Sequence, residues 1–250
     1  MEEDYKFDPT IGYDVVELPS KGIHYANGKK SVKVAYLTAS DEDILTSPNL
    51  IQSDMIVYEL VKRKILDKDL SIDDLDEEDK KAILIFLRNT AFGSDYTVTI
   101  KDPKTEIDFE HKFDLGSVDF KDFNLITNND GEYEYYMEKA KVNITFKFLT
   151  QKQQKEIEKL TKDWKFETPP PTITKQLEFM IKSVNGNKDQ LMIRNFVNNL
   201  PIQDSKDFRK YVNTNKPGIK LEQTAITPSG EKVQFNIGFG VEFFRPFYGL

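Results

Sequence analysis

The feature that most constrains the fold of this 250-residue chain is a short corner that occurs twice. Residues 32–38, VKVAYLT, and residues 142–150, VNITFKFLT, alternate apolar with polar side chains and then end in Leu-Thr. This alternation is typical of a half-buried strand. Thr38 is followed three positions later by an acid and Thr150 by an amide, which is the spacing of a helix capping box. The sequence therefore predicts two strand-to-helix corners, with Thr38 and Thr150 as the helix N-caps.

Helical sequence and then a proline-containing hairpin follow each corner. The first hairpin is predicted at residues 98–109, with Pro103 in its turn, and the second at residues 222–235, with Pro228 in its turn. Proline marks these turns because its fixed φ suits the second position of the common turn types. The repeated order predicts an α+β fold in two related halves, each with an N-terminal strand, a helical middle and a C-terminal β-hairpin. An internal duplication explains this order; the alternative is a recurrence of a common element order.

The junction between the halves is expected at a polar segment, TNNDG, at residues 127–131. We therefore predict an N-terminal domain at residues 1–122 and a C-terminal domain of similar plan at residues 123–250. Within the second half, the apolar spacing predicts a helix over residues 173–183. Asp204 is expected to cap a further short helix.

Composition and charge narrow the classes of function. The chain has 42 acidic and 35 basic residues and a formal net charge of -7, which disfavours non-specific binding to nucleic acid. The absence of cysteine excludes disulfides and thiolate catalysis and fits a reducing compartment. We expect no membrane insertion and no signal peptide, because no apolar run of about 18 residues is present and the first residues are acidic. One cluster of lysines is explained as a solvated strand edge; its members are Lys21, Lys29, Lys30 and Lys33.

No catalytic, cofactor or metal site is indicated by the sequence. The two histidines, His24 and His111, lie in different segments, and neither has a nucleophile or second ligand at a suitable spacing. Residues 67–78, DKDLSIDDLDEE, place acids at positions of a calcium loop, but Ile72 stands where such loops need glycine. These acids are better explained as favourable charges at a helix N-terminus. We therefore expect no enzyme, no metal and no cofactor.

Four segments together resemble a known protein family. They are residues 17–22, ELPSKG; residues 37–48, LTASDEDILTSP; residues 86–100, FLRNTAFGSDYTVTI; and residues 227–246, TPSGEKVQFNIGFGVEFFRP. In this order they resemble the baseplate hub and hub assembly proteins of T-even-like contractile-tailed bacteriophages. The likeness covers roughly residues 15–120 well. Some relatives carry paired cysteines at the hairpin turn, whereas this chain has KDPKT there. The resemblance therefore implies no metal-binding site at this turn.

The resemblance implies a non-enzymatic component or assembly factor of the baseplate hub that acts by protein–protein contact during tail construction. The implied partners are other baseplate hub proteins or the tape-measure protein, and the implied location is the host cytoplasm during assembly and then the virion tail. Two alternatives stay open. One is a transient tape-measure chaperone that is absent from the mature virion, and the other is a tail-associated hydrolase that acts on the cell wall.

The motif residues are expected to specify the fold rather than to bind a ligand. Proline restricts both its own backbone and that of its predecessor, so Leu18-Pro19-Ser20 fixes an extended approach to the first strand. Thr46-Ser47-Pro48 is expected to begin a helix. The aromatic C-terminal segment must be buried somewhere, either on its own second half or in a partner interface. The expected interface residues are Phe243, Phe244, Arg245, Phe247 and Tyr248.

Overall fold

The chain folds as a mixed α+β protein in two compact units. The computed structural model describes residues 12–25, 27–47, 55–239 and 241–244, with the backbone alone for residues 241 and 242. The first unit contains the chain up to Lys121 and again from Gly218 onward, and the second contains Asp122–Pro217. The expectation of one C-terminal domain at residues 123–250 is therefore corrected. Its last segment belongs to the first unit because the second hairpin packs there.

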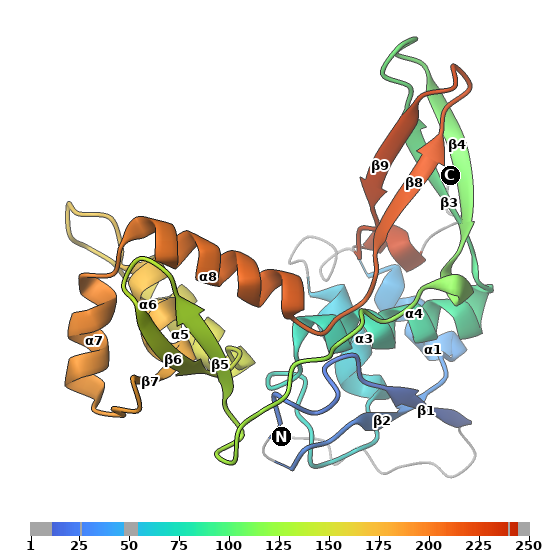
Figure 1. Ribbon diagram of the computed structural model, residues 1–250. Coiled ribbons are helices and arrows are strands. Elements are labelled where there is room, and N and C mark those ends of the chain that lie inside the picture. The colour runs from blue at the N-terminus through green and yellow to red at the C-terminus, as the bar shows by residue number, and fades with distance from the viewer. Residues whose placement is uncertain (1–11, 26, 48–54, 240, 245–250) are drawn as a thin grey trace. The chain divides into compact units, whose positions relative to one another are not determined.

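In its described part, the first unit contains the helices α1, α3 and α4 and three antiparallel strand pairs, β1–β2, β3–β4 and β8–β9 (Figure 1). Its described elements are β1 (Tyr13–Glu17), β2 (Ser31–Ala35), α1 (Ala39–Leu45), α3 (Ile56–Lys64), α4 (Glu77–Phe92), β3 (Asp95–Lys101), β4 (Asp108–Asp114), η1 (Leu115–Ser117), β8 (Glu222–Ile226), β9 (Lys232–Asn236) and η2 (Val241–Phe244).

The first Leu-Thr corner joins β2 to α1, as the sequence predicts. Thr38 is the N-cap of α1, and the carboxylate of Asp41 reaches back to accept the Thr38 N–H at 2.7 Å. The same carboxylate forms an ion pair with the ammonium of Lys64 on α3, and both side chains are buried. Asp41 therefore both caps α1 and ties it to α3.

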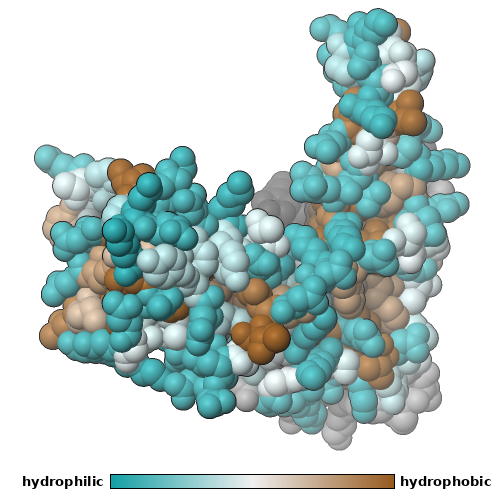
Figure 2. Space-filling view, in the orientation of Figure 1, coloured by the Kyte–Doolittle hydropathy of each residue, from teal (hydrophilic) through white to brown (hydrophobic). Residues whose placement is uncertain are grey.

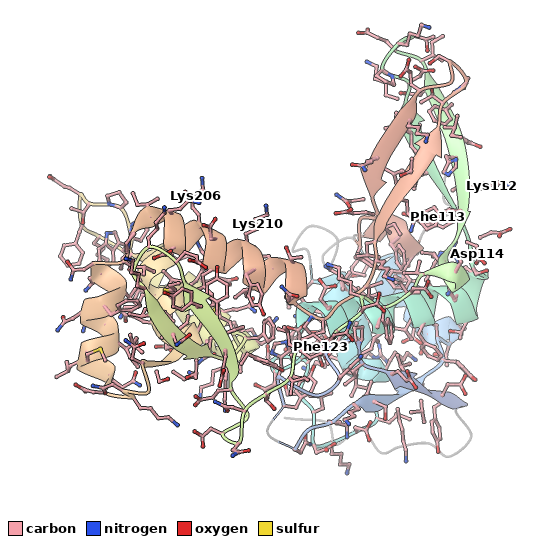
Figure 3. The ribbon with its side chains drawn as sticks, in the orientation of Figure 1. Lys112, Phe113, Asp114, Phe123, Lys206 and Lys210 are labelled. Atoms are coloured by element: carbon pink, nitrogen blue, oxygen red, sulfur yellow. The ribbon has the colours of Figure 1, made fainter. Side chains whose placement is uncertain are left out.

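The two proline hairpins of the chain lie side by side within the first unit (Figure 1). The ring of Phe235 on β9 meets His111 and Phe113 of β4 at centroid distances of 5.8 Å each. At the turns, Asp102 accepts hydrogen bonds from the backbone N–H and the hydroxyl of Ser229 at 3.1 and 2.9 Å. Phe113 and its exposed neighbours Lys112 and Asp114 are labelled in Figure 3, and hydrophilic residues cover most of this region's visible surface (Figure 2). The hairpins thus share a thin apolar interior.

The second unit is a three-stranded antiparallel sheet with four helices, in the strand order β5-β6-β7. The expected helix over residues 173–183 is partly wrong, because α6 ends at Met180 and the next residues pair with β6 as a third strand. Its elements are β5 (Tyr133–Met137), β6 (Val142–Phe146), α5 (Gln151–Lys162), α6 (Thr172–Met180), β7 (Ile181–Val184), α7 (Gln190–Asn198) and α8 (Ile202–Asn215).

The second Leu-Thr corner joins β6 to α5 with a complete capping box. The Thr150 hydroxyl accepts the Gln153 N–H at 3.3 Å, and the Gln153 side chain accepts the Thr150 N–H at 3.0 Å. Asp204 is not a cap, contrary to expectation, since α8 begins at Ile202 with Pro201 as its N-cap. The buried Asp204 carboxylate instead accepts N–H groups from the turn between β5 and β6. It therefore fixes α8 against that hairpin.

Candidate functional site

The Leu-Pro-Ser motif lies at the centre of the first unit. Leu18 is 2% exposed and belongs to the hydrophobic core. Ser20 is fully buried; its N–H donates to Asp79 Oδ1 at 2.8 Å and its hydroxyl to Asp79 Oδ2 at 2.6 Å. The glycine of the motif, Gly22, has φ +80°, and a Cβ there would collide with the carbonyl of Gly28. These residues therefore hold the connection between β1 and β2 against the N-terminal turn of α4.

Two further side chains complete this buried polar cluster. The Tyr25 hydroxyl donates to Asp79 Oδ2 at 2.5 Å and accepts the Asp76 N–H at 3.1 Å. Asp76 is the N-cap of α4, and its carboxylate lies 3.6 Å from Nε2 of His24, with both side chains buried. The buried polar cluster, as used below, consists of Ser20, His24, Tyr25, Asp76 and Asp79. From the sequence, these acids are predicted to be residues of a helix N-terminus. The sequence did not predict that Asp79 accepts hydrogen bonds from Ser20 of the Leu-Pro-Ser motif.

Burial dominates the electrostatics of the cluster. Removal from water raises the pKa of the Asp79 carboxyl, while the hydrogen bonds from Ser20 and Tyr25 act in the opposite direction. Burial and the adjacent Asp79 carboxylate raise the pKa of Tyr25, so its phenol stays protonated and donates its hydrogen bond. A carboxylate that accepts three donors in the interior is a structural anchor.

The cluster combines a hydroxyl, an imidazole and carboxylates, the residue types of hydrolytic catalysis. However, the Ser20 hydroxyl donates its proton to Asp79 rather than to His24, and Ser20 and Asp79 are both 0% exposed. A nucleophile needs access to a substrate and a base that accepts its proton. The observed arrangement fits a role in folding.

The Thr-Ser-Pro motif ends a helix in the described part of the chain. Thr46 is the C-cap of α1, and its hydroxyl donates to the carbonyl of Glu42 at 2.8 Å. The N–H of Ser47 donates to the carbonyl of Ile44 at 3.2 Å. Pro48, where the sequence predicts a helix to begin, lies outside the described residues.

The aromatic C-terminal segment docks on the first unit, so the expectation that it packs on its own second half is corrected. Phe243 and Phe244 are fully buried in the first unit's core, and Phe243 contacts Tyr96 of β3 at 5.3 Å between ring centroids. These two residues are therefore core, whereas the sequence also allowed an exposed interface. The other expected interface residues, Arg245, Phe247 and Tyr248, lie outside the described residues.

Arg88 holds this docked segment in place. The residue is 1% exposed, and its guanidinium donates to three carbonyl oxygens, those of Phe243, Gly93 and Asp95, at 3.1, 2.7 and 3.1 Å. It therefore joins α4, the start of β3 and the terminal η2 turn. Burial lowers the pKa of Arg88, but a guanidinium remains charged in proteins. The sequence placed this arginine in a family-like helix without assigning it a partner.

The lysine cluster and the acidic loop bind each other. Lys29 lies 2.7 Å from Asp69 and 3.5 Å from Asp67, and the Lys33 N–H donates to Asp67. These acids therefore compensate the charge of Lys29 and hold the backbone of β2 at Lys33. Within the described ranges, no group of three or more His, Cys, Asp or Glu side chains is placed to hold a metal ion.

One open cavity of about 530 Å³ lies in the first unit, between the start of α4 and the connection from Gly218 to β8. Of the two acids that line it, Glu78 and Glu222, Glu78 already accepts hydrogen bonds from Lys81 at 2.6 Å and from the Ile219 N–H at 3.0 Å. A Cβ on Gly218 would lie 2.6 Å from Glu78 Oε2, which explains the glycine. Glu78 therefore attaches the returning chain at Ile219.

Comparison with known proteins finds no matching family model, no matching curated protein and no matching solved structure. Among the helices in the described part of the chain, none has the length and apolar character needed to cross a membrane.

Proposed function

We propose that this chain is a non-enzymatic component or assembly factor of a contractile-phage baseplate hub, which acts through protein–protein contacts during tail construction. Its proposed partners are other hub proteins or the tape-measure protein, met in the host cytoplasm. The sequence resemblance motivates this proposal. The observation that carries it is the burial of the motif: Ser20 and its acceptor Asp79 are consumed in holding the fold.

The connections of the buried polar cluster explain why a scaffold would keep such a motif. Ser20 attaches the β1–β2 connection to the start of α4, and Arg88 near the end of α4 attaches the terminal segment and the base of β3. A single helix thus links the N-terminal motif to the base of the first proline hairpin and to the terminal η2 turn.

We further propose that the two halves share a duplicated plan. Each half contains an antiparallel strand pair, β1–β2 or β5–β6, that leads into a Thr-capped helix and later into a proline hairpin. The second hairpin packs beside the first rather than on its own half. Superposition of residues 32–45 on residues 144–157, which aligns Thr38 with Thr150, tests the plan; different crossing directions of strand and helix would contradict it.

The hub proposal is tested by quantitative mass spectrometry of purified virions of the phage that encodes the chain. Stoichiometric recovery supports a resident subunit. Absence from virions, together with defective tails when the gene is deleted, supports an assembly factor. Normal tails after deletion, with no copy in the virion, would overturn both forms of the proposal.

A complementation experiment connects this test to the structure. A plasmid copy carrying Asp79→Ala should fail to rescue the deletion, whereas the exposed neighbour variant Glu77→Ala should rescue it. Purified wild-type protein is also applied to a cell-wall zymogram. Clearing of the gel would replace the scaffold proposal by the hydrolase alternative.

A further inference from the structure

The outer face of α5 carries a line of lysines. Lys152, Lys155, Lys159 and Lys162 are spaced by three, four and three residues, which places them on one side of the helix, and all are exposed. The opposite side holds the buried Ile157 and packs on α6. At 1.5 Å per residue the line is about 15 Å long. We call these four residues the α5 lysine face.

A half-buried tryptophan and an exposed phenylalanine follow directly at the end of the helix. Phe166 is 71% exposed, and its ring lies 4.9 Å from that of Trp164 in an edge contact. The indole N–H of Trp164 donates to the carbonyl of Thr168 at 2.6 Å. This bond closes residues 164–168 into a compact turn, the Trp164 loop, in the connection between α5 and α6 (Figure 1). The loop holds a large apolar side chain in water, where its exposure is unfavourable.

The charges around the lysine face limit what can bind there. In the part of the chain that the structure describes, Lys152, Lys159 and Lys162 form no ion pair within 4.0 Å. Helical spacing places Glu156 and Glu158 along the two borders of the face. Positive charge is therefore confined to a narrow strip. A broad, phosphate-rich surface would meet the bordering carboxylates, whereas a single protein segment with carboxylates in line would not.

We propose that the α5 lysine face and the Trp164 loop form a docking surface for an acidic segment of a partner protein. The partner presents several carboxylates over about 15 Å and, at one end, an apolar side chain that covers Phe166. Aromatic side chains are frequent anchors of such interfaces, and lysines on the rim direct the approach. This inference rests on the proposed action through protein contacts and specifies the chemistry of one partner.

The full-length protein contains its own reporter of binding, because Trp164 is the chain's single tryptophan. The probe is a synthetic peptide without tryptophan that carries four glutamates at helical spacing and one leucine; a matched peptide has glutamine in place of glutamate. Titration with the acidic peptide should change Trp164 fluorescence saturably, and salt should weaken the binding. The glutamine peptide should bind at least about tenfold more weakly. A titration without saturable change would overturn the proposal.

Matched variants locate the effect on the surface. K159E/K162E should weaken peptide binding about tenfold or more, and K159Q/K162Q by less, because reversal adds repulsion to the lost attraction. The control K206E/K210E makes the same charge change on exposed lysines of α8 in the same unit (Figure 3) and should leave binding within about twofold. Circular dichroism checks that each variant is folded. Equal weakening by the control pair would show a diffuse charge effect and overturn the proposal.

The apolar half of the surface needs its own control. Phe166→Ser should weaken binding about tenfold, whereas Ile126→Ser, at a side chain that is 89% exposed in the same unit, should not. Single-stranded DNA of equal charge is titrated in parallel. Tighter binding of the DNA than of the peptide would identify a nucleic-acid site instead. Failure here leaves the virion test of the hub proposal unaffected, so the two proposals fail separately.

Discussion

Replacement of Asp79 by alanine is the most informative single change in the first unit. The carboxylate of Asp79 is fully buried and accepts the Ser20 N–H, the Ser20 hydroxyl and the Tyr25 hydroxyl at 2.8, 2.6 and 2.5 Å. Alanine removes the acceptor and leaves all three donors. It acts where the motif loop meets α4, so both segments should be destabilised together.

The magnitude follows from the donors left without a partner. Each fully buried donor of Ser20 costs about 1–3 kcal/mol when its acceptor is lost, while the partly buried Tyr25 hydroxyl can reach water. Release of a carboxylate that was unfavourably buried offsets part of the loss. We therefore expect a net destabilisation of about 2–4 kcal/mol.

Native-state hydrogen exchange with mass spectrometry resolves the effect by segment. Peptides from β1 and α4 should lose about 2–4 kcal/mol of protection. The matched control is Glu77→Ala in the same helical turn, whose carboxylate is 52% exposed and pairs with Lys80; it should cost under about 1 kcal/mol. If Asp79→Ala reduced protection no more than Glu77→Ala, the cluster would not be the anchor described above.

The pH dependence gives an independent check on the same residue. The pKa of Asp79 is raised in the folded state, so the folded protein keeps this proton at pH values where the unfolded chain has released it. Its contribution to stability is therefore fully present below the unfolded pKa of about 3.9 and is lost as pH rises through the folded value. Asp79→Ala should be more destabilising at about pH 4 than at about pH 8. An effect that grew with pH would contradict the burial argument.

Four further changes test other parts of the structure. Thr150→Ala should destabilise α5 by about 0.5–2 kcal/mol through loss of its N-cap. Hydrogen exchange should become faster in the first turn of α5 and stay unchanged in α7. Phe243→Ala should cost about 3–5 kcal/mol and truncation after Gly240 should cause aggregation, since Phe243 is core; a soluble truncated chain with unchanged thermal unfolding would refute this. Removal from water acts to raise the pKa of Asp102, but hydrogen bonds from Lys104 and Ser229 outweigh it and lower the pKa to about 2. The contribution of Asp102 to the stability of the fold is therefore present above the unfolded pKa and is lost as pH falls through about 2. Asp102→Asn should make the stability of the paired hairpins depend less on pH in acid. An unchanged pH dependence would contradict a stabilising role for the Asp102–Ser229 hydrogen bonds.

Interactions within a few residues of chain could be predicted from the sequence. Both Thr caps, the acidic start of α4 with its end at Gly93, and the two proline hairpins are confirmed. Each depends on hydrogen bonds or backbone preferences of adjacent residues, which the residue types largely determine. Of the local errors, the helix predicted at residues 173–183 is the more instructive. Leu177, Met180 and Val184 keep a helical spacing, yet residues 181–184 form a strand because they pair with the open edge of β6.

Long-range contacts were decided by the tertiary structure alone. Ser20 meets Asp79 across 59 positions, and Arg88 meets the carbonyl of Phe243 across 155. Neither separation carries a periodic signal, since such contacts depend on which buried donors and acceptors arrive at the same place. The return of the chain at Gly218 to the first unit is of the same kind. The sequence by itself determined the caps, turns and strand pairs. The mutual burial of distant polar and aromatic groups determined which of these local elements pack into the same core.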